Sequence, residues 1–111
     1  MTQDKNMISI VVPVYNEYES ISLLIYEIKK VMLDNKINFE LIVVNDGSKD
    51  ETYKVLLDLS NNINELIIIN LRKNYGQTAA LAAGFDNATG QIVISLDGDL
   101  QNDPNDIPVL I

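Results

Sequence analysis

The sequence contains neither cysteine nor histidine among its 111 residues. The lack of cysteine excludes disulfides, thiolate zinc sites and a cysteine nucleophile. The lack of histidine excludes serine–histidine catalysis and leaves oxygen atoms as the ligands of any metal site, which suits Mg²⁺, Mn²⁺ or Ca²⁺. Metal-dependent chemistry in this chain must therefore use carboxylates and other oxygen ligands.

Positive charge is also scarce, since 8 Lys and Arg stand against 16 Asp and Glu, for a net charge of −8. This excess of negative charge disfavours binding of the chain's surface to nucleic acid or to an anionic membrane. An anionic ligand still binds an acidic protein when a cation or a helix N-terminus mediates the contact. The sequence has no run long enough to span a membrane and no secretory signal at residues 1–7. We therefore expect a cytoplasmic protein.

Apolar residues make up 47% of the sequence, which predicts one folded domain over residues 1–111. Nearly continuous runs rich in β-branched residues predict buried strands over 8–14 and 39–45, and two further strands are expected over 65–71 and 91–96. Helical spacing and composition predict helices over 20–34 and 78–86. A capping box of Ser48 and Glu51 predicts a further helix that extends to Ser60, and Asp103 caps one that begins at Pro104.

The alternation of strands and helices predicts an α/β fold, a Rossmann-like doubly wound and mostly parallel sheet with strand order 3-2-1-4. The sequence stops at Ile111 within an apolar run that has no C-cap signal. We therefore expect the chain to be the front part of a longer protein.

Polar clusters follow three of the predicted strands, at residues 13–17, 45–48 and 97–99. In a doubly wound sheet the ligand binds beyond the carboxyl ends of the strands, where the strand order reverses. The three clusters are therefore expected to face one cleft. The first strand is not followed by the glycine-rich turn of a dinucleotide site, and the sequence has no Walker A loop, which argues against a dehydrogenase and a P-loop nucleotidase.

The segment Asp97-Gly98-Asp99 places two carboxylates one residue apart at the end of a strand. Gly98 lets the backbone bend so that both turn toward one cation, and Gln101 adds a neutral oxygen nearby. A divalent ion would relieve the negative field that these carboxylates produce. The alternative is that these residues only form a turn, since Asp-Gly-Asp triplets are common there.

Three further positions have two interpretations each. Asp46 either accepts a hydrogen bond from a nucleobase or forms an Asx turn or helix cap. Tyr15 either stacks on a base or covers the sheet edge, and Glu17 either bonds within its loop or helps to cap the first helix. The cations of residues 72–76 either lie against a phosphate or face solvent.

Taken together, the motifs resemble a known family. Residues 12–17 (VPVYNE), 44–48 (VNDGS) and 96–101 (LDGDLQ) resemble the nucleotide-sugar half of the family 2 glycosyltransferases, which have the GT-A fold. Residues 72–81 and 99–104 resemble, more narrowly, the branch that contains dolichol-phosphate mannose synthase and the bacterial undecaprenyl-phosphate glucosyltransferases. The resemblance covers nearly the whole chain from Ile8.

The resemblance implies roles for individual residues. Asp97 and Asp99 match the Asp-x-Asp motif that holds Mg²⁺ or Mn²⁺ against the diphosphate, and Gln101 matches a further polar contact to the donor. Asp46 matches the acidic residue that contacts the base. The loop that cradles base and ribose is matched by Pro13, Tyr15 and Glu17. Asn45 departs from the pattern, since many members carry a second Asp there.

The implied reaction is transfer of a sugar from a UDP- or GDP-sugar to an acceptor, with a polyprenyl phosphate expected in the lipid branch. Such an acceptor is already anionic, so no catalytic base is needed, and no catalytic residue is assigned in this chain. The resemblance places the acceptor half and any membrane segments beyond Ile111. The 111-residue chain alone is therefore expected to be inactive, and the longer protein to lie at the cytoplasmic face of the membrane.

Two alternatives stay open. A phosphotransferase of the haloacid dehalogenase type also uses Asp-x-Asp in an α/β sheet, although there the motif follows the first strand and precedes Thr, whereas here it precedes Leu100. The other alternative is a non-catalytic nucleotide-binding module.

Overall fold

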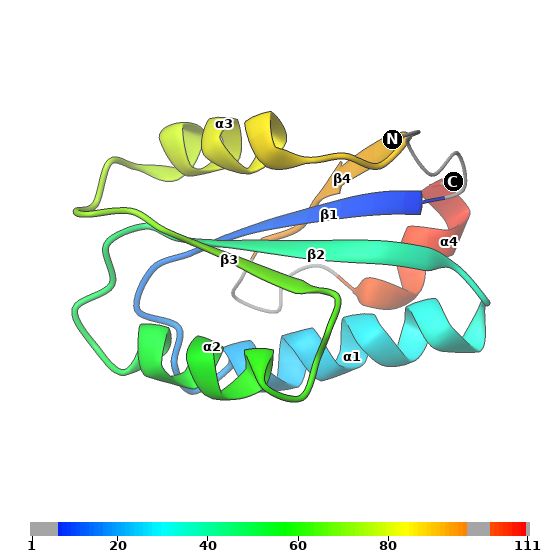
Figure 1. Cartoon of the computed structure of the whole chain (residues 1–111), viewed down its shortest axis with the longest axis horizontal. Helices are drawn as coiled ribbons and strands as arrows, with labels where there is room; N and C mark the ends of the chain where they lie inside the picture. Colours follow the sequence, from blue (N-terminus) through cyan, green and yellow to red (C-terminus); the bar gives the residue numbers. More distant parts are fainter. Residues whose placement is uncertain (1–6, 98–102, 111) are drawn as a thin grey trace.

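The computed structural model describes residues 7–97 and 103–110. A four-stranded sheet forms its centre, with α3 on one face and α1 and α2 on the other (Figure 1). The strands are β1 (Met7–Val14), β2 (Asn38–Asn45), β3 (Leu66–Asn70) and β4 (Ile92–Ser95). The helices are α1 (Ile21–Asp34), α2 (Thr52–Ser60), α3 (Gln77–Asn87), a 3₁₀ turn (Pro104–Asp106) and α4 (Ile107–Leu110).

The strand order is β3-β2-β1-β4, and every neighbouring pair is parallel. The predicted α/β sheet and its order are therefore confirmed. In the register, Val14 of β1 lies opposite Asn45 of β2, and Asn45 lies opposite Asn70 of β3. Because these three strands end together, the loops that follow them start from one edge of the sheet.

The central strands β1 and β2 are buried on both faces, which explains why their sequences are continuously apolar, whereas the outer strands β3 and β4 are partly exposed. Alternate residues of β1, such as Ile10 and Val12, belong to the larger core shared with α1. Val11 points to the opposite face and packs with Ile42 and Ala80 beneath α3. The sheet therefore supports helices on both sides and holds its carboxyl edge in a fixed position.

Helix α3 lies unusually close to the sheet at Gly84. A Cβ atom at this position would be 2.3 Å from Cγ1 of Val11 and 3.2 Å from Cγ2 of Val44. Only glycine fits such a distance, so Gly84, together with the buried Ala80, lets α3 pack closely against β1 and β2.

A buried carboxylate fixes the connection from α3 to β4. Glu40 of β2 accepts hydrogen bonds from the Ser9 hydroxyl, from the backbone N–H of Thr89 (2.7 Å) and from the Thr89 hydroxyl. The Ser9 hydroxyl in turn accepts one from the backbone N–H of Gly90 (2.7 Å). These bonds tie the residues just before β4 to the centre of the sheet, and so they hold the strand that leads to Asp97.

The predicted start of α2 was wrong. The helix begins at Thr52, and its N-cap Glu51 makes no side-chain capping hydrogen bond. Ser48 instead accepts a hydrogen bond from the backbone N–H of Asn16 (2.9 Å), so it joins two loops and does not cap a helix. A hydrogen bond between distant residues is therefore found in place of the local helix cap that the sequence predicts.

The predicted cap at Asp103 is confirmed, since its carboxylate accepts a hydrogen bond from the backbone N–H of Asn105 (2.9 Å). Within residues 7–97 and 103–110, none of the helices has the length and apolar character that crossing a bilayer requires.

Candidate functional site

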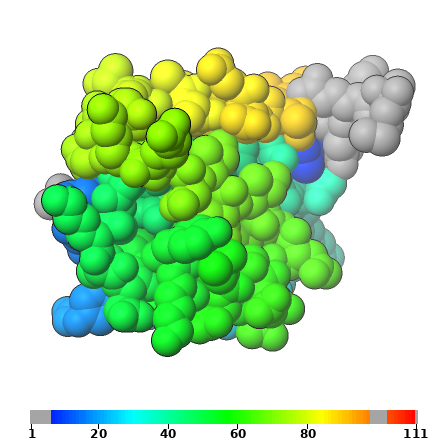
Figure 2. All heavy atoms as spheres, turned by 60° about the vertical axis from the view of Figure 1, so that its left-hand side comes forward, coloured from blue at the N-terminus to red at the C-terminus, as the bar shows by residue number. Residues whose placement is uncertain are grey.

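The loops that follow the strands meet at the carboxyl edge of the sheet, which is the left side of Figure 1. Figure 2 turns this side forward and shows the yellow-green segment after β3 above the green segment after β2. The predicted clusters at residues 13–17 and 45–48 therefore lie at one edge, and of the third cluster the structure describes Asp97.

The loop after β1 is joined to the loop after β2 through Asn16. Its backbone N–H donates to the Ser48 hydroxyl (2.9 Å), and its side-chain oxygen accepts from the backbone N–H of Lys49 (2.8 Å). Asn16 has a φ of 54°, a left-handed conformation that Asn adopts more readily than most residues. The neighbouring Tyr15 ring is 40% exposed, while Pro13 is buried near the end of β1.

Glu17 organises the start of α1. Its carbonyl oxygen accepts from the backbone N–H groups of Ser20 (3.1 Å) and Ile21 (3.0 Å), and its carboxylate accepts from the Ser20 hydroxyl (3.0 Å). Its own N–H donates to the Thr52 hydroxyl at the start of α2 (3.0 Å). In the structure Glu17 therefore bonds within its loop and joins that loop to α2.

Asp50 supports this contact, since its carboxylate accepts from both the hydroxyl and the backbone N–H of Thr52. Burial raises the pKa of Asp50, but the hydrogen bonds from Thr52, together with those from backbone N–H groups of Tyr18 and Asp50, outweigh burial and leave this pKa below its usual value. The carboxylate is therefore charged at neutral pH and holds Thr52 toward Glu17.

Asp46 holds the loop that follows β3. Its side chain is 4% exposed, and Oδ1 accepts from the backbone N–H of Tyr75 (2.8 Å). Oδ2 accepts from the backbone N–H of Gly76 (3.0 Å) and from Nδ2 of Asn74 (3.3 Å). The sequence suggested a base contact, an Asx turn or a cap, and the structure adds a further role as the anchor of residues 74–76.

Gly47 provides the surface on which this loop lies. Its φ is +70°, and a Cβ atom there would be 2.2 Å from the carbonyl carbon of Lys73 and 2.4 Å from the backbone nitrogen of Asn74. Both the conformation and the close approach require glycine.

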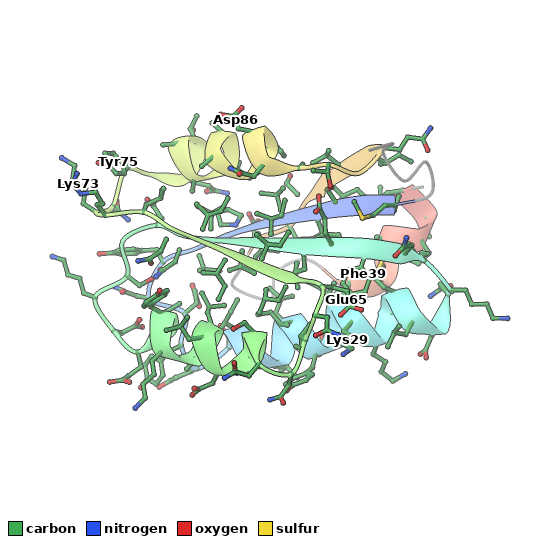
Figure 3. All side chains as sticks on the ribbon, in the orientation of Figure 1. Lys29, Phe39, Glu65, Lys73, Tyr75 and Asp86 are labelled. Atoms are coloured by element: carbon green, nitrogen blue, oxygen red, sulfur yellow. The ribbon has the colours of Figure 1, made fainter. Side chains whose placement is uncertain are left out.

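The cations of this loop are on the surface. Arg72 and Lys73 are exposed, and the Lys73 ammonium lies 5.3 Å from the centroid of the Tyr75 ring. This separation is within the range of a cation–π contact. Figure 3 shows the two side chains together at the tip of this loop. The loop therefore presents positive and aromatic side chains at the same edge as Asp46.

Asp97 follows β4 and is partly buried. Its Oδ1 accepts a hydrogen bond from Nε2 of Gln77 (3.1 Å), the first residue of α3. Gln77 directly follows Gly76, which donates to Asp46. Asp46 and Asp97 therefore lie at the same edge, although β2 and β4 are not neighbours in the sheet.

The metal site predicted from the sequence is only partly described. Asp99 and Gln101 lie outside the described residues, and within residues 7–97 and 103–110 no three acidic residues gather in a way that would hold a metal ion. Asp97 itself provides a carboxylate oxygen, a hard ligand that fits Mg²⁺ or Mn²⁺. Asp97, the one predicted metal ligand that the structure describes, is therefore chemically suited to a divalent ion.

Three asparagine and glutamine residues in the site were missed by the sequence reasoning. Asn16, Asn74 and Gln77 hold the loops together through side-chain amides. Asn74 before Tyr75-Gly76 carried a local turn signal, whereas nothing near Gln77 in the sequence pointed to Asp97, which is 20 positions away.

Asn45, the departure from the family pattern, also has a defined place. It is buried, donates from Nδ2 to Oδ1 of Asn70 (2.7 Å) and accepts from the backbone N–H of Ser48 (3.3 Å). The amide therefore joins β3 to the turn that carries Asp46.

Known proteins resemble this chain in both sequence and fold. The chain is 46% identical over 107 residues to an undecaprenyl-phosphate 4-deoxy-4-formamido-L-arabinose transferase from Proteus mirabilis, which covers 96% of this chain and 33% of the relative. It is 41% identical to a dodecaprenyl-phosphate galacturonate synthase from Rhizobium johnstonii, covering 94% of this chain and 31% of the relative. The chain thus spans about a third of the length of these curated relatives.

Among solved structures, a mannosyltransferase from Pyrobaculum calidifontis in complex with GDP-Man and Mn²⁺ superposes with a TM-score of 0.78. The sequences are 25% identical, and the match covers 89% of this chain and 29% of that one. The model of the family described as glycosyl transferase family 2 matches residues 9–111. The chain therefore belongs to glycosyl transferase family 2.

Proposed function

We propose that this chain forms the donor-binding part of a glycosyltransferase that moves a sugar from a UDP- or GDP-sugar to a polyprenyl phosphate, with Mg²⁺ or Mn²⁺ as cofactor. The observation that carries the proposal is that residues 74–77 contact both Asp46 and Asp97. One short segment thus joins the residue expected at the base to a residue expected at the metal. A nucleoside diphosphate has its base at one end and its phosphates at the other, so it could contact Asp46 and a metal ion at Asp97 at the same time.

The proposed roles follow the loops. Asp46 receives the base, and Pro13, Tyr15 and Glu17 form the loop beside base and ribose. The divalent ion is held by Asp97 together with Asp99, and Gln101 makes a further polar contact to the donor. A metal ion bound there stabilises the negative charge that develops on the departing diphosphate.

The proposed reaction needs no base from this chain. A phosphate oxygen of the acceptor forms a bond to the anomeric carbon of the sugar while the bond from that carbon to the diphosphate oxygen breaks. The products are a polyprenyl phosphate sugar and a nucleoside diphosphate. Because the attacking oxygen is already anionic, no proton has to be removed.

The acceptor is supported by the two relatives whose names specify an undecaprenyl or a dodecaprenyl phosphate. The residues 72–81 that resemble the lipid branch form the loop held by Asp46 and the start of α3. We propose that the protein works at the cytoplasmic face of the membrane, through parts that this chain does not contain.

Membership in family 2 removes the phosphotransferase of the haloacid dehalogenase type as an alternative. A non-catalytic nucleotide-binding module stays as an outcome of the test, since it would retain the metal and nucleotide site without transfer.

The test begins with calorimetric titration of UDP, GDP and their sugars, with and without Mn²⁺. We expect Mn²⁺ to tighten nucleotide binding in the wild type, and we expect Asp99→Asn to abolish this effect of the metal. Asp86→Asn is the matched control, because Asp86 is exposed on α3 and the charge change is the same (Figure 3). Binding that ignores both the metal and Asp99→Asn would contradict the proposed donor site.

The acceptor is tested on a longer protein that contains this chain, with radiolabelled donor and polyprenyl phosphate. The proposal predicts label in the lipid fraction. Donor binding without transfer to any acceptor would favour the non-catalytic module, and faster transfer to sugar or protein hydroxyls would refute the lipid acceptor.

A further inference from the structure

We infer that residues 74–77 act as a positioning segment that fixes the Asp46 carboxylate at one end and the Asp97 carboxylate at the other. The inference rests on the proposed function, because it deepens the role of the same site. None of these four residues is proposed to react, and Asn74 and Gln77 act through the two carboxylates.

The contact at Asp46 is built from backbone as well as side chain. The N–H groups of Tyr75 and Gly76 point at different oxygens of one buried carboxylate, and the Asn74 amide donates to the Oδ2 atom and to the backbone carbonyl of Asp46 (3.2 Å). Hydrogen bonds to a charged acceptor are stronger than neutral ones. The carboxylate is therefore fixed in orientation before any ligand binds.

This arrangement restricts how Asp46 meets a ligand. Each carboxylate oxygen accepts about two hydrogen bonds, and Oδ2 already accepts two from Gly76 and Asn74. The acceptor capacity left for a base N–H is therefore on Oδ1, which accepts one bond from Tyr75. The segment thus determines which oxygen faces the ligand.

The contact at Asp97 comes from the same segment one residue later. Gln77 is exposed, and its Nε2 donates to Oδ1 of Asp97 at 3.1 Å. The helix that Gln77 begins is held against the sheet at Gly84, so its first turn has a fixed position. A side-chain amide on a fixed helix orients a carboxylate in the way that outer-shell partners orient metal ligands.

The contact at Asp46 is tested without any ligand, by hydrogen exchange of the chain followed by NMR. We expect the amide hydrogens of Tyr75 and Gly76 to be protected in the wild type. In Asp46→Asn, which loses one acceptor oxygen, the exchange of Gly76 should accelerate more than tenfold. Asp86→Asn is the control and should leave both rates unchanged. Rapid exchange of both amides in the wild type would overturn the inference.

The contact at Asp97 is tested by comparing Gln77→Ala with Thr78→Ala, a substitution of the next, exposed residue of α3. We expect Gln77→Ala to weaken UDP or GDP binding about tenfold in the presence of Mn²⁺ and to leave metal-free binding unchanged. Thr78→Ala should change neither. Equal weakening with and without Mn²⁺, or no weakening, would show that Gln77 does not act through Asp97.

Failure of the proposed function has a separate signature. If the wild type shows no metal-dependent nucleotide binding, the proposed donor site is refuted. The contacts of residues 74–77 are then tested separately, by the amide exchange of Tyr75 and Gly76 and by the side-chain amide resonance of Gln77. That resonance should shift in Asp97→Asn and stay in place in Asp86→Asn. An unshifted resonance would overturn the contact.

Discussion

Replacing Gly47 by alanine tests whether the loop after β3 truly lies on the turn after β2. The new Cβ would be 2.2 Å from the Lys73 carbonyl carbon and 2.4 Å from the Asn74 nitrogen, both backbone atoms that no rotamer change can move. Alanine at a φ of +70° costs roughly 1–2 kcal/mol, and overpacking adds about 1–3 kcal/mol. We therefore expect Gly47→Ala to lower the free energy of unfolding by about 2–5 kcal/mol.

The assay is urea denaturation followed by circular dichroism, with amide exchange at Tyr75 as a local readout. Lys36→Gly calibrates the conformational part, because Lys36 is exposed and has a φ of 56° just after α1. It should stabilise the chain by roughly 1 kcal/mol. The contrary result is that Gly47→Ala lowers the free energy of unfolding by no more than Lys36→Gly raises it, and leaves the Tyr75 amide protected. That result would show that the loop does not lie on Gly47 and would refute the reasoning.

Three further substitutions test the fold around the site. Gly84→Ala should destabilise by about 1–2 kcal/mol in urea, because its clash with Val11 exceeds the gain in helix propensity, and a stabilised variant would contradict the close packing of α3. Glu40→Ala removes the acceptor of the buried Ser9 hydroxyl and of the part-buried Thr89 donors and should lower the free energy of unfolding by about 3 kcal/mol, whereas a cost below about 1 kcal/mol would show that the network contributes little. Asp50 has a folded pKa below its unfolded value near 3.9, so its stabilisation is present above about pH 4 and is lost as the pH falls further. In Asp50→Asn the unfolding free energy should fall less below pH 4 than in the wild type, and an unchanged acid profile would refute this role.

The sequence predicts this structure best where consecutive residues of an element have the same surroundings. β1 and β2 are covered on both faces, so their sequences are continuously apolar, and the alternation with helices then limits the topology to a parallel sheet. The cap at Asp103 was predictable because its partner is only two residues away.

The site itself depends on contacts that no local pattern encodes. Ser48 has the spacing of a helix cap, but its hydroxyl accepts a hydrogen bond from Asn16, 32 positions earlier, and α2 begins at Thr52. Asp46 was correctly expected at the sheet edge, but its anchoring of residues 74–76 depends on a loop 28 to 30 positions away. Residues 98–102 lie outside the described part of the chain, so the roles of Asp99 and Gln101 stay predictions.

Asp46 and Asp97 are proposed to act on the same nucleotide in a single donor site. The most direct measurement is calorimetric titration of UDP and GDP into the wild type, Asp97→Asn and Asp86→Asn, each with and without Mn²⁺. The account predicts that Mn²⁺ tightens nucleotide binding in the wild type and in Asp86→Asn and has no effect in Asp97→Asn. An equal effect of Mn²⁺ on all three proteins would contradict it.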